Sequence, residues 1–188
     1  MPRCACIDIG SNTTRLLVGE DRHGRLREVL AVRAFTHLGE ACGAGGRIAP
    51  EKMAEIAQVV TRQVHLAREL GVDAIRVVAT AAVRQAANRE ELTRAVRATG
   101  VRMEILTGEE EARLAFAGAI GTLVDPPPGE LGVVDVGGGS TELVVGTAAR
   151  GVTWSTSLPL GSGSVTASHL ASDPPSVAEL AAVRDRLQ

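Results

Sequence analysis

The first part of the chain shows three short apolar runs followed by one long helical pattern. Residues 4–10 and 14–20 predict two strands around a Gly-Ser-Asn turn, and residues 26–35 predict a third strand. A glycine-rich stretch at 39–49 predicts a loop. Residues 50–70 open with a proline and carry apolar residues at helical spacing, which predicts a helix.

Strands and helices alternate in the next part of the chain. The pattern predicts, in order, a strand at 74–80, a helix from 88 to 100, a strand at 102–106 and a helix at 108–123. Asn88 is expected to cap the first of these helices, and Glu91 to complete a capping box three residues later.

One linker, Val-Asp-Pro-Pro-Pro-Gly-Glu, follows these elements. Consecutive prolines cannot lie inside a helix, so we place a domain boundary there, with a first lobe over 1–125 and a second over 126–188. After the linker, the pattern predicts strands near 131–137, 141–147 and 151–158, and a last helix from Asp173 to the chain end. The sequence stops without a C-cap signal, so the second lobe is expected to be incomplete.

The first hairpin is repeated in the second lobe. Residues 6–19 read CIDIGSNTTRLLVG and residues 133–146 read VVDVGGGSTELVVG, and the two align without a gap. Asp8 then matches Asp135, and Gly10 matches Gly137. Each copy predicts a strand, a tight glycine turn and a second strand, and the repeat across two lobes indicates related structures.

The predicted turns are suited to binding phosphate. Such a turn leaves several backbone N–H groups unpaired and directed the same way, and glycine allows a close approach of the ligand. An acid at the mouth of the turn can hold Mg²⁺, directly or through water. The alternative is a plain tight hairpin with aspartate as a turn former, but matching apolar flanks in two copies favour the phosphate site. A P-loop is excluded, because no Gly-Lys-Ser/Thr is present, and a dinucleotide fingerprint fails because a strand follows the glycines.

Composition narrows the range of partners. The 188 residues are 45% hydrophobic and 22% charged, which favours a folded core or two small lobes over disorder. The net charge is -2 and no basic run occurs, so neither nucleic acid nor a membrane surface is an expected partner. Cys4, Cys6 and Cys42 are expected to be buried free thiols, and the scattered histidines predict no zinc site. Without a signal-peptide pattern, a cytoplasmic location is expected.

Four ordered motifs carry a family resemblance: Asp-Ile-Gly-Ser-Asn-Thr (8–13), Ala-Thr-Ala-Ala-Val-Arg (79–84), Gly-Glu-Glu-Glu-Ala-Arg (108–113) and Asp-Val-Gly-Gly-Gly-Ser-Thr-Glu (135–142). Together they resemble the exopolyphosphatase and guanosine pentaphosphate phosphohydrolase family, within the superfamily of acetate kinase, sugar kinases, Hsp70 and actin. The resemblance implies a two-lobed α/β, actin-like ATPase (ribonuclease H-like) fold with a mixed sheet in each lobe. Family members continue for well over a hundred further residues, so the second lobe is expected to be truncated here.

The three consecutive glutamates begin a predicted helix, and two of them need no special role. Glu109 and Glu110 are expected only to complement the helix dipole. Glu111 lies at the edge of the apolar face, beside Ala115 and Gly118, whose small size would let another element approach. A carboxylate there could deprotonate a water, and in the family the matching position is the proposed catalytic base.

The remaining roles concern metal and phosphate. Asp8, Asp135 and Glu142 are expected to hold Mg²⁺, with a monovalent cation as an optional companion; a salt bridge to an arginine stays open for Glu142. The resemblance makes Arg84 a phosphate clamp, and Arg15 suits a second one. The turn residues expected to bind phosphate are Gly10, Ser11, Asn12, Thr13, Gly137, Gly138, Gly139, Ser140 and Thr141.

Together, these expectations predict a hydrolase that acts on a chain of phosphates. The favoured reading is an exopolyphosphatase that releases orthophosphate from polyphosphate with Mg²⁺. The alternatives are a guanosine pentaphosphate phosphohydrolase, a kinase-like ATP user of the same superfamily, and a non-catalytic module that binds polyphosphate or a nucleotide. A homodimer is implied only as a family trait.

Overall fold

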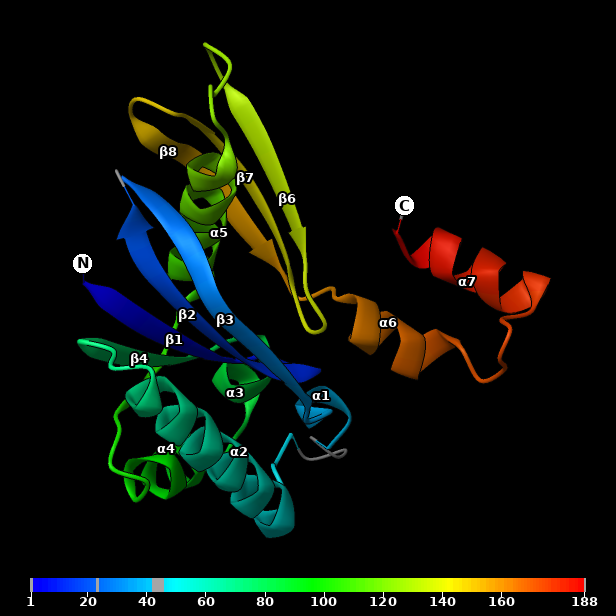
Figure 1. Ribbon diagram of the computed structural model, residues 1–188. Coiled ribbons are helices and arrows are strands. Elements are labelled where there is room, and N and C mark those ends of the chain that lie inside the picture. The colour runs from blue at the N-terminus through cyan, green and yellow to red at the C-terminus, as the bar shows by residue number, and fades with distance from the viewer. Residues whose placement is uncertain (1, 23, 42–45, 188) are drawn as a thin grey trace.

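The computed structural model describes residues 2–22, 24–41 and 46–187. Two sheets lie one above the other, with a helix between them, and two C-terminal helices extend to one side (Figure 1). Within the described residues no helix is long and apolar enough to cross a membrane. The expectation for Cys42 lies outside the described residues.

The first five strands form one mixed sheet in the order β3-β2-β1-β4-β5. Their bounds are Arg3–Ile9 (β1), Thr13–Arg22 (β2), Arg25–Phe35 (β3), Ala74–Ala79 (β4) and Met103–Ile105 (β5). β1, β2 and β3 are antiparallel, whereas β4 and β5 run parallel to β1. The turn between β1 and β2 therefore lies at the edge of the sheet where β1 and β4 both end.

Helices cover one face of this sheet: α1 (Leu38–Ala41), α2 (Pro50–Glu69), α3 (Ala81–Gln85) and α4 (Arg89–Arg97). Alternate residues of β1, namely Ala5, Ile7 and Ile9, are buried against the apolar face of α2, as period-two alternation requires. This main core fixes the position of β1 and hence of the turn that follows it.

The second sheet is antiparallel, in the order β6 (Leu131–Val136), β7 (Thr141–Thr147) and β8 (Gly151–Leu158). α5 (Gly108–Thr122) covers one of its faces, and Ala112, Phe116 and Val144 form a small second core there. α6 (Ser162–His169) and α7 (Val177–Leu187) follow and bury none of their described residues.

The packing of α5 bears on the predicted lobe boundary. α5 precedes the linker, yet it packs against β7 and β8 of the second sheet. The division at residues 125 and 126 stays a prediction, and these contacts favour an earlier division, between β5 and α5.

The repeat seen in the sequence extends to structural detail. Both copies are antiparallel hairpins, β1–β2 and β6–β7. The second strand of each copy also shifts register against the strand that follows it. The shift lies between Val18 and Gly19 where β2 pairs with β3, and between Val145 and Gly146 where β7 pairs with β8, and these are matching positions. The same irregularity at matching positions indicates that the repeat is structural and not a chance likeness of two turns.

Several local predictions were wrong. Asn88 is the N-cap residue of α4, but its side chain forms no capping hydrogen bond. Instead, its Oδ1 accepts from the Ile48 amide and its Nδ2 donates to the Ile48 carbonyl, both at 2.9 Å. The capping box belongs to α5, between Thr107 and Glu110. Cys4 is exposed and Cys6 is half-buried, rather than both being buried, and both are free thiols.

The sequence pattern missed three helices. α1 overlaps the stretch expected to be a loop and begins one residue before it, and α3 lies between the strand predicted at 74–80 and the helix predicted from 88. The third, α6, lies before the last predicted helix, which begins at Val177 rather than at Asp173. All three are too short to repeat an apolar stripe of helical period, which is the signal that sequence-based prediction depends on.

Candidate active site

The two glycine turns have the same internal hydrogen bond. The Gly10 amide donates to the Thr13 carbonyl at 3.0 Å, and the Gly137 amide donates to the Ser140 carbonyl at 2.9 Å. The donor and the acceptor of this bond occupy matching positions in the two hairpins, so the two turns have the same backbone structure.

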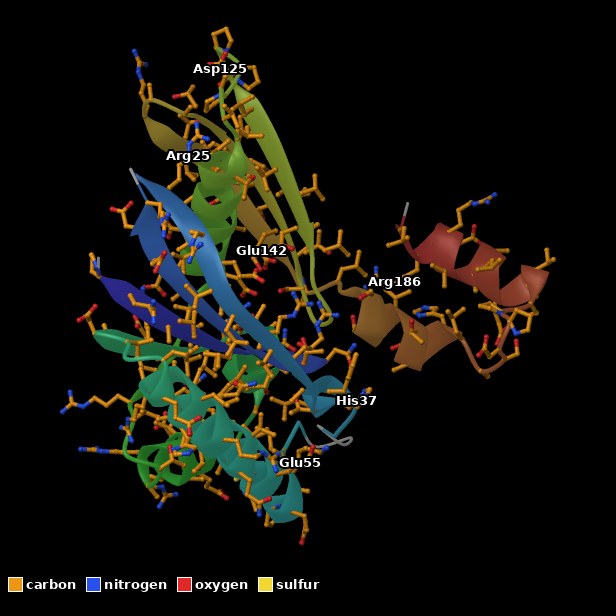
Figure 2. All side chains as sticks on the ribbon, in the orientation of Figure 1. Arg25, His37, Glu55, Asp125, Glu142 and Arg186 are labelled. Atoms are coloured by element: carbon orange, nitrogen blue, oxygen red, sulfur yellow. The ribbon has the colours of Figure 1, made fainter. Side chains whose placement is uncertain are left out.

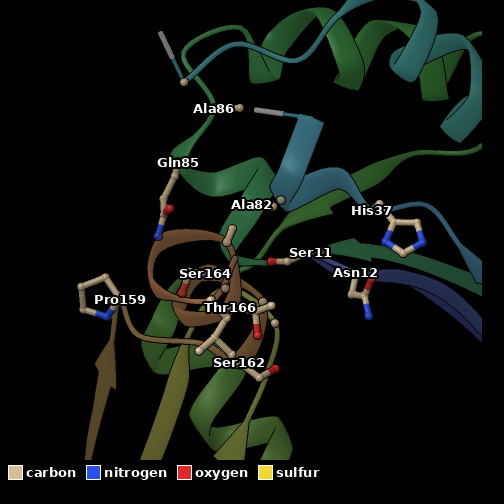
Figure 3. Close-up of a pocket in the computed structure, with 17 residues that line it drawn as sticks. Ser11, Asn12, His37, Ala82, Gln85, Ala86, Pro159, Ser162, Ser164 and Thr166 are labelled. Carbon is tan, nitrogen blue, oxygen red and sulfur yellow. The ribbon is translucent and has the colours of Figure 1, made fainter. Parts of the chain in front are cut away.

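Neighbouring helices hold the carbonyls of both turns. In the first turn, the Ser11 carbonyl accepts from the Gly39 amide of α1 at 2.7 Å. In the second, the Gly137 and Gly138 carbonyls accept from the Ser162 and Ser164 amides of α6 (2.9 and 3.1 Å). Figure 3 shows a pocket that Ser11 of the first turn and Ser164 of α6 both line.

The amides of the two turns, by contrast, remain available. Among the described residues, those of Ser11, Asn12, Gly138 and Gly139 donate no hydrogen bond. Carbonyls that are fixed from behind and amides that stay free are the arrangement that anion-binding nests use. The turns also lie against one another, since a Cβ on Gly138 would be 3.3 Å from the Ser11 Cβ.

Both turns open onto one cavity of about 330 Å³ between the sheets. Four carboxylates line it: Asp8 of β1, Glu111 of α5, Asp135 of β6 and Glu142 of β7. Figure 2 shows Glu142 between the two sheets, in the interior of the molecule. All predicted site residues line this cavity except Arg84 and Thr141; their roles stay predictions.

Strand register explains why the acids meet. Asp8 pairs with Arg15 across β1 and β2, and Arg15 pairs with Arg33 on β3, so the three side chains share one face. In the other sheet, Asp135 pairs with Glu142, and Glu142 with Ser157. The two rows of side chains face each other across the cavity.

The buried carboxylate of Asp8 has few favourable interactions that offset the loss of its hydration. Burial raises the pKa of its carboxyl, Arg15 opposes that rise, and Asp135 adds to it. Its Oδ1 is buried and has no hydrogen-bond partner among the described residues. A buried carboxylate oxygen with free lone pairs is costly, so the site favours a proton or a cation there.

Glu111 differs from the two glutamates before it, as predicted. Glu110 completes the capping box of α5, and Glu109 pairs with Arg113 on the surface at 2.6 Å. The Glu111 side chain is 17% exposed, and its Oε2 accepts from Nη1 of Arg84 at 2.9 Å. Burial raises the pKa of Glu111, the Arg84 hydrogen bond lowers it, and Glu142 raises it further.

The guanidinium group of Arg84 already has protein partners. The same Nη1 also donates to the Leu106 carbonyl at 2.8 Å. The guanidinium therefore orients Glu111 and does not line the cavity. Thr141 likewise faces elsewhere, because its hydroxyl donates to the Leu160 carbonyl.

Glu142 is 1% exposed, and a hydroxyl is its partner. Ser157 Oγ donates to its Oε1 at 2.7 Å, and among the described residues it forms no ion pair with an arginine. The salt bridge left open by the sequence is therefore not formed there. Ser157, Arg33 and Phe35 were missed by sequence reasoning; all three positions depend on strand register rather than on a local motif.

The acids suit a hard cation held by few protein ligands. Among the described residues no three acidic, histidine or cysteine side chains are already arranged to hold a metal. Mg²⁺ does not require such a group, since it usually takes one or two carboxylates and completes its shell with water and substrate phosphate. The unpartnered Oδ1 of Asp8 and the nearby Asp135 fit that mode.

We expect Asp8→Asn to raise thermal stability at neutral pH. The raised pKa means that the folded state binds the Asp8 proton more tightly, so the ionised carboxyl destabilises the fold, and stability falls as pH rises through the folded pKa. The variant should melt about 2–4 °C higher near pH 7. The difference should shrink as the pH falls and vanish near about pH 3, below the pKa of an aspartate in the unfolded chain, where the carboxyl is neutral in both states.

Circular-dichroism melts at the two pH values measure this effect. Asp185→Asn, at an exposed position on α7, is the control and should leave the Tm almost unchanged. A lower Tm of Asp8→Asn near pH 7 would show instead that the charge of Asp8 stabilises the fold.

Comparisons with known proteins agree with this architecture. The model of the Ppx/GppA phosphatase family matches residues 17–188. Exopolyphosphatase 2 of Mycobacterium tuberculosis (strain CDC 1551 / Oshkosh) is 36% identical, over 100% of this chain and 62% of that protein. The structure of the Aquifex aeolicus PPX-GPPA enzyme superposes with a TM-score of 0.80 at 36% identity, covering 99% of this chain and 62% of that one.

An exopolyphosphatase structure from Cytophaga hutchinsonii gives a TM-score of 0.82 at 25% identity, over 94% of this chain and 56% of that one. The predicted α/β, actin-like fold is confirmed by these matches. The chain spans less than two thirds of the length of these relatives. With a family model matching nearly its whole length and both turns in place, the chain belongs to the Ppx/GppA phosphatase family.

Proposed function

We propose that this chain carries the hydrolytic site of an exopolyphosphatase, which releases orthophosphate from the end of a polyphosphate chain. The observation that supports this most is the shared cavity, where two amide nests and four carboxylates meet. Nests bind phosphate oxygens, and the acids supply a base and metal ligands. The names of the relatives agree, although those proteins are longer.

In the proposed reaction the terminal phosphoryl group binds at the turn amides. The Oε2 of Glu111 is held by Arg84, so its Oε1 is left to accept a proton from the attacking water. The raised pKa makes this carboxylate a stronger base than an exposed glutamate. The amides then stabilise the charge on the phosphoryl oxygens as water attacks and the shortened chain leaves.

We propose Asp8, Asp135 and Glu142 as the residues that hold Mg²⁺. The ion would neutralise charge on the phosphate oxygens. The ligand set is chemically apt, because all three offer carboxylate oxygens in one cavity and one of those oxygens lacks a partner.

The test is orthophosphate release from polyphosphate in the presence of Mg²⁺. Release that stops on addition of EDTA and returns with Mg²⁺ supports the proposal. Polyphosphate binding without release would support the non-catalytic module instead. Release unaffected by EDTA would contradict the metal assignment and leave the hydrolase.

One observation favours guanosine pentaphosphate as a second candidate substrate. Phe35 lines the mouth of the cavity, is 62% exposed, and stacks on His37 with ring centroids 6.0 Å apart and an interplanar angle of 22°. An exposed ring beside a phosphate site offers a surface on which a guanine base could stack.

We expect Phe35→Ala to separate the two substrates. If a base stacks on Phe35, the variant should raise KM for guanosine pentaphosphate by about tenfold, since base–aromatic stacking contributes about 1–3 kcal/mol. KM for polyphosphate, which has no base, should stay near the wild-type value. Equal values for the nucleotide in both proteins would remove Phe35 from the site and favour polyphosphate.

A further inference from the structure

Arg33 lines the catalytic cavity and had no role in the sequence motifs. β3 is the edge strand of the first sheet (Figure 1). On this strand, Arg33 lies directly opposite Arg15 of β2. Arg15 in turn lies opposite Asp8. Cross-strand neighbours have their Cβ atoms about 4.5–5.5 Å apart, so the two guanidinium groups and the carboxylate form one continuous row.

The pairing of these arginines is unusual for this sheet. Arg3, Arg22 and Arg27 all pair with Glu20 at the other end of the sheet. Arg15 instead donates only to the Thr13 hydroxyl, at 3.2 Å, and among the described residues Arg33 makes no hydrogen bond or ion pair. Asp8 offsets part of the charge of Arg15, whereas Arg33 pairs with no acid among the described residues, so an anion beside these two neighbouring like charges would be stabilising.

The acidic and the basic residues occupy different parts of the cavity. The carboxylates Asp8, Glu111 and Glu142 lie at its inner part, beside the turns, whereas Arg15 and Arg33 are exposed on the β3 side. A substrate held by its terminal phosphoryl at the turns would have to pass the acids and leave along the arginines. Guanidinium groups suit this task, since their forked donors bind phosphate oxygens in pairs.

We propose that Arg33, together with Arg15, binds the phosphate groups that follow the reacting one and so makes the site prefer long phosphate chains. This inference rests on the proposed function. Because β3 is the edge strand of the first sheet, no further strand among the described residues limits the length of a chain bound at Arg33.

The test compares Arg33→Ala and Arg33→Lys with Arg62→Ala, which removes the same charge from an exposed site on α2 outside the cavity. We expect Arg33→Ala to raise KM for long polyphosphate by about tenfold, since a hydrogen bond to a charged group contributes about 1.5–3 kcal/mol. kcat and the inhibition constant of orthophosphate, which occupies only the reacting position, should stay at wild-type values. Arg33→Lys should recover part of the loss.

Salt dependence adds a readout that a folding defect would not produce. Losing one charged phosphate contact should flatten the dependence of log KM on log salt for Arg33→Ala, whereas Arg62→Ala should keep the wild-type slope. Guanosine pentaphosphate is measured in parallel. A larger loss with long polyphosphate than with the nucleotide supports contact with the phosphate groups that follow the reacting one, and a loss with the nucleotide alone overturns it.

The outcomes separate the inference from the function on which it rests. Wild-type hydrolysis together with equal KM values for Arg33→Ala and Arg62→Ala overturns the inference alone. A wild-type chain that neither binds nor hydrolyses polyphosphate overturns the proposed function, and the inference falls with it. If the wild type binds without hydrolysis, the Kd of polyphosphate replaces KM in the same comparison.

Discussion

Replacing Glu111 by glutamine is expected to lower kcat for orthophosphate release by about 10²–10⁴-fold, the range that a positioned general base contributes. Glutamine keeps the shape of the side chain and can still accept from Arg84, but it cannot take a proton from water. KM for polyphosphate should change little, because the turns and the arginines bind the substrate. Initial rates of orthophosphate release over a range of polyphosphate concentrations separate the two constants.

Glu109→Gln is the matched control. Glu109 lies on the same helix, is exposed and pairs with Arg113. It does not line the cavity between the two sheets, so its variant should keep the wild-type kcat. The pH profile gives a second check. The wild-type rate should fall as pH decreases through the raised pKa of Glu111, because only the ionised carboxylate accepts a proton. A Glu111→Gln protein with wild-type kcat would assign the base to another group.

The features that sequence reading predicted correctly are local in the chain. Each turn lies within a gapless 14-residue stretch whose apolar flanks and glycines specify a hairpin. The same stretch contains the acid beside the turn, so Asp8 and Asp135 could be assigned to one site as soon as the two hairpins were paired. The place of Glu111 beside the site could be predicted because the three glutamates occupy different helical faces, whereas its catalytic role stays a prediction.

The features that sequence reading missed depend on contacts between distant segments. Ser157 and Arg33 reach the site only through the register of β8 and β3, which no short motif encodes. Asn88 has the residue type and place of a helix cap, but the Ile48 backbone, 40 residues earlier, competes for its side chain. Gly118 was expected to make room for a neighbour, yet no atom lies within 4 Å of a Cβ placed there.

Gly161→Ala is expected to damage the second turn more than any conservative change outside the turns themselves. Gly161 is the N-cap of α6 and has an ordinary extended backbone, with φ -124° and ψ 161°. Alanine would therefore not strain the backbone dihedral angles, but its Cβ would overlap the backbone of Gly138 and Gly139. Backbone atoms cannot rotate aside, so either α6 or the turn must move, and the bonds from Ser162 and Ser164 to the turn carbonyls would be disturbed.

Overpacking of this kind typically destabilises a fold by about 1–3 kcal/mol, which for a chain of this size lowers Tm by about 2–4 °C per kcal/mol. The functional loss should be larger, since a displacement of about 1 Å in a positioning element can lower the rate by about 10²-fold. We therefore expect kcat/KM for polyphosphate to fall by about that factor in a protein that still folds. Thermal melts and initial rates measure the two effects separately.

Gly118→Ala is the opposite case within the same chain. Gly118 lies inside α5 with open space around it, so alanine should stabilise the helix by about 0.5–1 kcal/mol and leave kcat/KM unchanged. The contrast isolates contact with the turn from any general effect of replacing glycine. A folded Gly161→Ala protein with wild-type kcat/KM would mean that the second turn does not hold the reacting phosphate, and the site would then have to rely on the first turn and the carboxylates.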